Sequence, residues 1–408
     1  MTQPSPTHRT RSPRASQRGL TLIELMVSLL ISFVLSLAIF AVLSSSEGFK
    51  RTTTSVNDIN QAGNYAMYTI DKWVRSAGSG FAQAAPYTFG CTVFASRSGT
   101  QILPAAAAAP APFDGVNTTG TVGQFRLAPI LIAPGQSALS NPSDPATASD
   151  ALIVMAGAAG NAETAVDFSD WSALGKLTLA STVSFRANDI VLVADTQGAT
   201  GTLAPCMVQQ VSAAASAVSA KEVNLAGAYA SDSIGSQSLT ALPLESAAIN
   251  LGNIAGGNPP SFLMIGIGAN NTLRSYDLLQ ATGTPLVVPV ADGIFEMHAL
   301  YGVDNDNNGT IDAWVDPSSS ATYTLAALMA GDQTASNLLQ SIKAVRVGLI
   351  TRTSLPEKPS AGTVAPATLT LFGDLGLTYT RTLTAAERQF RYRTIESTIP
   401  IRNSMLLN

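Results

Sequence analysis

Two helical hydrophobic patterns follow one another in the N-terminal part of the chain. Over residues 20–43 almost every position is apolar, and Glu24 is the only charged residue in this run of 24. About 20 apolar residues suffice for a helix to span a bilayer. Over 56–77, apolar residues recur every three or four positions between polar ones, which is typical of an amphipathic helix. The pattern predicts one long helix over 20–78, with a transmembrane segment at 20–43 and a second half that packs on a globular domain.

Glycines interrupt this helical pattern at three places. Gly48 follows a serine-rich stretch, and we expect the helix to bend or loosen there. Gly63 lies within the amphipathic half, where glycine costs about 1 kcal/mol relative to alanine. Gly78 and Gly80 form a helix stop.

Beyond residue 81 the pattern changes to short apolar runs bounded by turn residues, which predicts strands. The expected strands are 151–155, 189–194, 207–211, 262–267, 273–279, 286–290, 294–303 and 345–351. Stretches of low complexity at 105–112 and 212–220 predict linkers, and a Gly/Pro-rich break at 256–260 precedes the later strands. The fold class is therefore α+β: a long helix docked on a β-rich domain over 79–408. This domain is either one sheet with large insertions or is softly subdivided near residue 250.

Composition and charge limit the number of domains and the kinds of partner that the protein can have. The chain has 408 residues, enough for one large or two ordinary domains. Charged residues make up 12% of it, about half the usual share. The formal net charge is −4, and removal of residues 1–19, which hold four arginines and no acid, leaves −8. This acidic balance disfavours nucleic acid as a partner.

The charges around the apolar run indicate its orientation. Arg9, Arg11, Arg14 and Arg18 precede it, so the N-terminus is expected to stay in the cytoplasm while the rest is exported. A secretory signal has its small-residue cleavage site after the apolar core, whereas Gly19 precedes it here. An ionised carboxylate in apolar surroundings costs several kcal/mol unless it is paired. Glu24 is therefore expected to have a functional partner.

The two cysteines, Cys91 and Cys206, would lie in an oxidising compartment after export. An even number of cysteines there favours a disulfide, and two separate buried thiols are the alternative. No Cys-x-x-Cys occurs, so a zinc or thioredoxin-type site has no support.

The segment from Arg18 to Glu24, RGLTLIE, resembles the type IV prepilin signature that pilins share with type II secretion pseudopilins. The resemblance implies cleavage after Gly19 by a prepilin peptidase and methylation of the new amine on Leu20, where many members have Phe or Met. It also implies that Glu24 pairs with the terminal amine of a neighbouring subunit. A simple signal anchor that tolerates a glutamate is the alternative.

Three further segments resemble the PilW-like minor pilins. Residues 64–81 resemble the helix end of these proteins and of the J-type pseudopilins, with Asp71, Arg75, Ala77 and Gly78 at matching places. Segments 345–353 and 391–403 resemble their last strands, and 82–290 matches only loosely. The resemblance implies a pilin-like fold.

The function implied is that of a minor pilin, which primes assembly of a type IV pilus or forms part of its tip complex. The implied partners are the prepilin peptidase, other minor pilins, the major pilin and a tip adhesin. The protein would be held in the inner membrane, with its C-terminal domain in the periplasm, before it enters the pilus. The alternatives are a J-type minor pseudopilin and a membrane-anchored, calcium-dependent adhesion module.

Residues 304–312, DNDNNGTID, carry the only metal-like spacing in the sequence. Oxygen-bearing side chains at relative positions 1, 3, 5 and 9, with glycine at 6, fit a calcium loop. The candidate ligands are Asp304, Asp306, Asn308, Asp312 and the carbonyl of Thr310. The twelfth position is Val315 rather than Glu, unless Asp316 substitutes, and the loop follows a strand, so this is not an EF-hand. Calcium as a cofactor and a metal-free Asn/Asp/Gly turn both fit the pattern.

The sequence offers little for catalysis, and we predict no enzymatic activity. His298 is the only histidine after the leader, and no nucleophile elbow, Walker loop or His-Glu-x-x-His motif occurs. Alternation along 294–301 puts His298 on a face with Ile294, Glu296 and Leu300, opposite Phe295, Met297 and Tyr301. A single histidine on a strand is typical of a structural polar group.

Overall fold

The computed structural model describes residues 19, 21–116, 123–135, 149–159, 164–196, 203–214, 216–281, 286–357, 362–405 and 407. Most of the predicted leader, together with Leu20, lies outside these residues. The chain forms two compact units, Met1–Thr54 and Ser55–Asn408. The predicted subdivision near residue 250 stays a prediction.

The N-terminal helix is the longest element. Helix α1 runs from Leu22 to Ser76 without interruption, so the backbone stays helical through Gly48. The first turn is capped by Thr21, whose Oγ1 accepts a hydrogen bond from the backbone N–H of Glu24 at 3.2 Å. At the other end Gly78 takes a φ of +78°, which stops the helix as predicted. The long helix and the β-rich domain after it confirm the α+β class.

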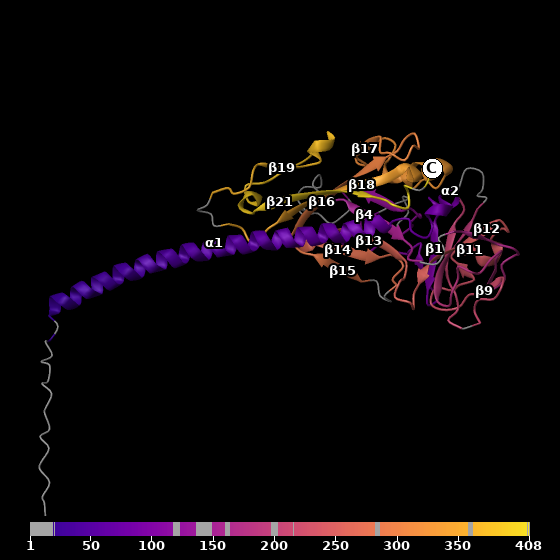
Figure 1. Ribbon diagram of the computed structural model, residues 1–408, viewed down its shortest axis with the longest axis horizontal. Helices are drawn as coiled ribbons and strands as arrows, with labels where there is room; N and C mark the ends of the chain where they lie inside the picture. Colours follow the sequence, from indigo (N-terminus) through magenta and orange to yellow (C-terminus); the bar gives the residue numbers. More distant parts are fainter. Residues whose placement is uncertain are drawn as a thin grey trace, which may run out of the picture. The chain divides into compact units, whose positions relative to one another are not determined.

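The strands form three larger sheets rather than one continuous sheet (Figure 1). The six-stranded sheet has the order β2 (Thr100–Leu103), β1 (Val93–Arg97), β8 (Cys206–Gln210), β7 (Asp189–Asp195), β12 (Ser246–Asn253), β5 (Val166–Asp167). The five-stranded sheet has the order β15 (Val287–Ala291), β14 (Thr272–Asp277), β13 (Ser261–Gly268), β4 (Ala151–Ala156), β3 (Ile130–Ala133). The four-stranded sheet has the order β17 (Ala313–Val315), β16 (Ile294–Val303), β18 (Ile342–Arg352), β21 (Tyr392–Pro400).

Smaller elements complete the fold. The two-stranded sheets are β6 (Lys176–Thr178) with β9 (Glu222–Asn224), β10 (Ser233–Ile234) with β11 (Gln237–Ser238), and β19 (Thr368–Leu371) with β20 (Tyr379–Thr382). The short helices are α2 (Ala85–Thr88), α3 (Leu325–Leu328) and α4 (Gln333–Ser341). Single 3-10 turns lie at Ala82–Ala84, Leu239–Ala241, Ala269–Asn271, Gly373–Leu375 and Glu387–Gln389. All eight strands that the sequence predicted are present, as β4, β7, β8, β13, β14, β15, β16 and β18.

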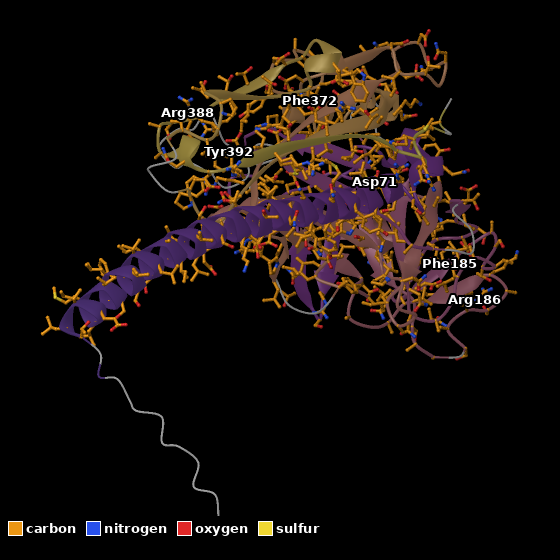
Figure 2. All side chains as sticks on the ribbon, turned by 60° about the vertical axis from the view of Figure 1, so that its left-hand side comes forward. Asp71, Phe185, Arg186, Phe372, Arg388 and Tyr392 are labelled. Atoms are coloured by element: carbon orange, nitrogen blue, oxygen red, sulfur yellow. A yellow bond between two sulfur atoms is a disulfide. The ribbon has the colours of Figure 1, made fainter. Side chains whose placement is uncertain are left out.

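Three clusters of buried side chains hold the second unit together. The largest joins the buried face of α1, which includes Ile70 and Val74, to strands of all three larger sheets. A second cluster around Phe185 lies under β6 and β9. A third, around Phe372, fills the space between the four-stranded sheet and the β19–β20 hairpin, and Figure 2 labels Phe185 and Phe372. The amphipathic half of α1 therefore docks on the β-rich domain, as its pattern predicted.

One strand departs from simple alternation. The pairing of β16 with β18 shifts register between Ile294 and Glu296. Ile294 therefore packs in the main core, while Phe295 joins Leu300 in the cluster under the hairpin. The prediction that Ile294 shares a face with Leu300, opposite Phe295, is wrong at these two residues, because a bulge reverses the alternation of side chains.

Candidate functional site

The first unit contains the residues that the sequence predicts for processing and membrane anchoring. Gly19 lies just before α1, and Thr21 and Glu24 form its first turn. Glu24 therefore lies where the positive end of the helix dipole stabilises a carboxylate. The side chains of 21–47 are exposed, and the helix is long and apolar enough to cross a membrane. An exposed apolar surface of this size needs a lipid or protein environment.

The residues of segment 64–81 that resemble the PilW-like helix end make specific contacts at the end of α1. Arg75 binds Asp71 one turn earlier in a bidentate ion pair, with distances of 2.6 and 2.8 Å. Ala77 is fully buried, and the N–H of Gly78 donates to the carbonyl of Met155 in β4 at 2.9 Å. The ion pair stabilises the last turns of the helix, and the contacts of Ala77 and Gly78 fix its end to the five-stranded sheet.

The C-terminal segment also reaches this helix end. The side-chain amide of Asn403 donates to the carbonyl of Ala77 at 2.9 Å. The carbonyls of the last helical turn have no partner within the helix, so Asn403 satisfies one that would otherwise stay unpaired. This contact gives a physical role to the Asn that closes the segment 391–403.

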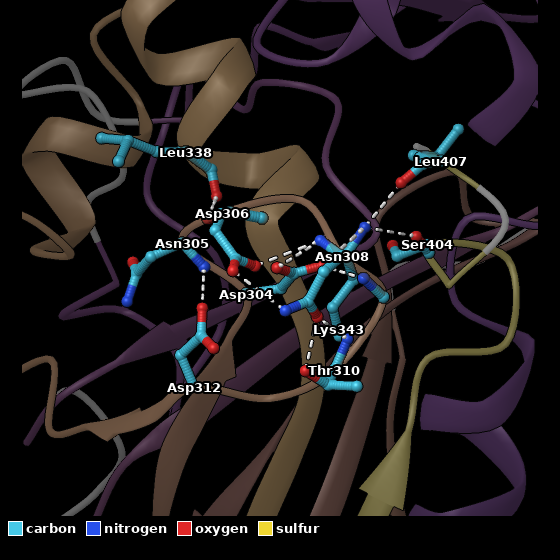
Figure 3. Close-up of polar contacts among 12 residues, drawn as sticks. Asp304, Asn305, Asp306, Asn308, Thr310, Asp312, Leu338, Lys343, Ser404 and Leu407 are labelled. Atoms are coloured by element: carbon cyan, nitrogen blue, oxygen red, sulfur yellow. Dashed lines mark hydrogen bonds and ion pairs between the residues drawn. The ribbon is translucent and has the colours of Figure 1, made fainter.

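The acidic loop, residues 304–312, joins β16 to β17 (Figure 3). The buried carboxylate of Asp304 accepts hydrogen bonds from the backbone N–H groups of Asn308 (3.1 Å) and Gly309 (2.8 Å). Asp312 accepts from the N–H of Asn305 at 2.7 Å. Carboxylate oxygens of Asp304, Asp306 and Asp312 all lie within 4.8 Å of one another. The structure thus brings these three predicted ligands together around one point.

The other two candidate side-chain ligands, Asn308 and Asp316, lie in different places. Asn308 lies inside the loop, where its Oδ1 accepts hydrogen bonds from the backbone N–H and the hydroxyl of Thr310. Asp316 was the candidate to replace the missing glutamate at the twelfth position. Within the described residues, it is not part of the cluster formed by the carboxylates of Asp304, Asp306 and Asp312. Its Oδ1 instead accepts hydrogen bonds from the N–H and the hydroxyl of Ser318. The loop therefore offers a cation oxygen ligands without a bidentate carboxylate at its end.

A buried lysine faces the loop, and sequence reasoning missed it. The ammonium of Lys343 lies 3.9 Å from Oδ2 of Asp304 and donates to the carbonyls of Ser404 (3.1 Å) and Leu407 (2.7 Å). Burial alone would raise the pKa of Asp304, but the N–H donors of the loop and Lys343 outweigh it and lower that pKa. Strand β18 is buried along almost its whole length, and its nearly continuous apolar run around Lys343 was the available signal that the lysine is buried.

A second group of charges surrounds His298. Its imidazole stacks on Tyr379 at 3.8 Å between ring centres and lies between Asp150 (3.7 Å) and Glu296 (3.5 Å). The fully buried Glu296 also binds Arg381 at 2.6 Å and accepts a hydrogen bond from Tyr379 at 3.0 Å. Desolvation would lower the pKa of His298, but the two carboxylates raise it to about 9. The cluster links β16 to β20 and to the residue before β4.

The cysteine pair is a disulfide, as the even count favoured. Cys91 and Cys206 are bonded, with 5.8 Å between their Cα atoms. Cys206 begins β8, and its N–H donates to the carbonyl of Thr92 at 2.9 Å. The bond clamps β1 beside β8, the one parallel strand pair in the part of the chain that the structure describes.

Comparisons with known families match both ends of the chain. Residues 14–40 match the prokaryotic N-terminal methylation motif, and residues 264–403 match the type IV pilus-assembly protein W family. Over these two segments the chain is similar to PilW-like type IV pilins. No curated protein and no solved structure matches it.

The two matches cover several of the features described above. The PilW-like match covers β14 to β21, the acidic loop, His298 and Asn403, and the methylation motif covers Gly19, Leu20 and Glu24. Domains of this family are structural rather than enzymatic. The match implies a membrane-anchored, pilus-associated protein with other pilins and the prepilin peptidase as its partners.

Proposed function

We propose that this PilW-like pilin is a minor pilin, which primes assembly of a type IV pilus or forms part of its tip complex. The observation that supports the proposal is the presence, on one chain, of a prepilin signature and a PilW-like C-terminal region. A large domain of 354 residues, Ser55–Asn408, follows the anchor. A domain of this size suits an initiating or capping subunit better than one repeated along a filament. The proposed role is structural and involves no catalysis.

In this mechanism the helix anchors the precursor in the inner membrane, with the large domain in the periplasm. Cleavage after Gly19 then exposes the amine of Leu20, which is methylated. Glu24, held in the first helical turn by the Thr21 cap, meets the amine of a neighbouring subunit in apolar surroundings. Each charge offsets the desolvation of the other, so the pair sets the register between subunits.

Two substitutions test this mechanism in cells. Gly19→Ala should leave an uncleaved precursor, and mature protein of normal size from that variant would refute the processing step. Glu24→Ala should be processed normally but recovered at about a tenth of the normal amount in sheared pili. Glu47→Ala is the matched control, because Glu47 is an exposed acid of the same helix. If Glu24→Ala and Glu47→Ala enter pili equally well, the proposed pairing is wrong.

We further propose that the loop over 304–312 binds calcium weakly. The clustered oxygens of Asp304, Asp306 and Asp312 support this, whereas Lys343 already compensates part of their charge. Isothermal titration of the full chain in detergent should give a saturable heat with millimolar calcium. Asp306→Ala should abolish this heat and Asp316→Ala should keep it. Equal heats from the two variants would contradict the proposal.

A further inference from the structure

The sheets of the second unit differ in how their edges are protected. Most edge strands are short: β5 and β17 have two and three residues, and β2 and β3 have four each. Strand β15 has five residues, includes Pro289 and shifts register against its neighbour β14. Short strands, prolines and irregular pairing are the usual means by which proteins prevent the addition of further strands.

Strand β21 has none of these protections along its length. It has nine residues, and all nine pair with β18 without a shift in register. Its only proline, Pro400, is the last residue. On its other side β21 has no strand partner in the part of the chain that the structure describes. It is therefore the longest regular edge strand among the described sheets.

The pairing of β21 with β18 determines which backbone N–H and C=O groups of β21 point outward. The carbonyl of Arg391 accepts from the N–H of Thr353, and the N–H of Ile401 donates to the carbonyl of Lys343. Odd-numbered residues thus direct their backbone groups toward β18. Because these directions alternate along a strand, Thr394 and Glu396 direct their N–H and C=O groups outward.

A groove of about 520 Å³ lies along the first half of this edge. One wall is formed by 56–60 of α1 and the other by 364–369 before and within β19, and residues 391–394, at the start of β21, also line the groove. In Figure 1 β21 lies between the second half of α1 and β19. The walls supply apolar side chains, including Ile59 and Leu369, which could receive the apolar side chains of an added strand.

The charges around the groove indicate the chemistry of its occupant. Arg393 is exposed and donates to the amide oxygen of Asn60 at 2.6 Å. Arg388 donates to the carbonyl of Ala365 and the hydroxyl of Thr363, which are also neutral. Arg391 is paired with Glu357. Two guanidinium groups whose hydrogen bonds go to neutral oxygens favour a partner that carries carboxylates.

We propose that the free edge of β21 is a strand-addition site for another subunit of the pilus. The occupant is an extended segment with alternating apolar residues and at least one carboxylate, which pairs with the outward groups of Thr394 and Glu396. Its carboxylate meets Arg393, and its apolar side chains fill the groove between α1 and β19. This inference rests on the proposed role in the pilus and adds to it the surface through which the domain binds a partner.

A proline at an outward-facing position tests the inference. Thr394→Pro removes an N–H that points away from β18, so it blocks strand addition and leaves the internal ladder intact. Thr394→Ala is the matched control, because it loses the same hydroxyl and keeps the N–H. We expect about a tenfold loss of Thr394→Pro from the complex recovered with co-expressed minor pilins, and normal recovery of Thr394→Ala. Arg393→Glu should behave like the proline variant, whereas Arg402→Glu, at an exposed residue just beyond β21, should not.

Hydrogen exchange of the unaltered protein gives a readout that does not depend on any variant. The amides of Thr394 and Glu396 should exchange fast in the full chain alone in detergent and at least tenfold more slowly in the complex. Unchanged exchange, or equal recovery of Thr394→Pro and Thr394→Ala, would overturn the inference. It would also be overturned if the purified chain dimerises through this edge, seen as a dimer in sedimentation that Thr394→Pro dissociates. If Glu24→Ala is excluded from pili and Thr394→Pro is not, the inference fails while the proposed function stands.

Discussion

Gly63 of α1 lies against Ile395 of β21 so closely that a Cβ atom on Gly63 would be 2.5 Å from Cδ1 of Ile395. The same Cβ would be 2.8 Å from Cγ2 of Thr351 in β18. Both distances are shorter than any ordinary carbon contact. The glycine lets the helix approach two strands that lie about 290 and 330 residues further along the chain. This approach outweighs the cost of a glycine within a helix, which is about 1 kcal/mol.

A larger residue at position 63 should therefore separate the helix from the sheet. We expect Gly63→Val to lower the free energy of unfolding by about 1–3 kcal/mol, the usual cost of overpacking a core. Chemical denaturation of the full chain in detergent measures this change. Gln61→Val, at an exposed position of the same helix, should have a small effect. If the two variants are equally stable, the contact with Ile395 does not limit the packing.

A second substitution should relieve the clash between a side chain at position 63 and Ile395. Ile395→Ala removes the atom nearest to the added Cβ, so it should make Gly63→Ala less harmful than it is in the unaltered chain. A double-mutant cycle on these two residues measures the coupling, which we expect to be about 0.5–3 kcal/mol, as for residues in contact. Additive effects would show that the two side chains do not meet.

The stability of the protein should depend on pH through His298. Its pKa is raised from 6.5 to about 9 in the folded chain, where Asp150 and Glu296 face it, Tyr379 stacks on it and Arg381 lies on the far side of Glu296. A group with a raised pKa stabilises fully below its unfolded value, and this contribution is lost as the pH rises toward 9. The loss between pH 6.5 and 9 should be on the order of 3 kcal/mol.

Thermal unfolding between pH 6 and 9.5 measures this dependence. His298→Gln is the control, because a neutral amide cannot titrate in that range. We expect the variant to be less stable than the unaltered protein at pH 6, with a smaller difference at pH 9.5. Parallel curves for the two proteins would show that His298 does not change its charge over this interval.

Removal of the disulfide should destabilise the second unit strongly. Cys91 and Cys206 are 115 residues apart, and closing a loop of that length contributes about 4–5 kcal/mol in the chain-entropy model. The pair Cys91→Ser and Cys206→Ser should show this loss in chemical denaturation. Unaltered protein unfolded with reductant should approach the stability of the double variant. A loss below about 1 kcal/mol would show that the unfolded chain is compact without the bond.

Local sequence patterns were sufficient to predict the features that depend on residues close together in the sequence. The apolar run and the stop at Gly78 depend on neighbouring residues, and so do the eight predicted strands, each of which has its own alternation or apolar run. The acidic loop could likewise be found from its spacing, because its candidate ligands lie within nine consecutive residues. Local patterns failed at Ile294 and Phe295, because a bulge depends on the pairing of β16 with β18 and not on the composition of β16.

By itself, the sequence determined that the chain carries a prepilin signature, a helix able to cross a membrane and a β-rich domain ending in PilW-like strands. Only the tertiary structure decided that Lys343 faces Asp304, that Asn403 caps α1 and that β21 remains an open edge beside a groove. These relationships join residues that are tens to hundreds of positions apart. Burial, close approach and the direction of backbone groups depend on which strands pair, and pairing is decided by the packing of the whole domain.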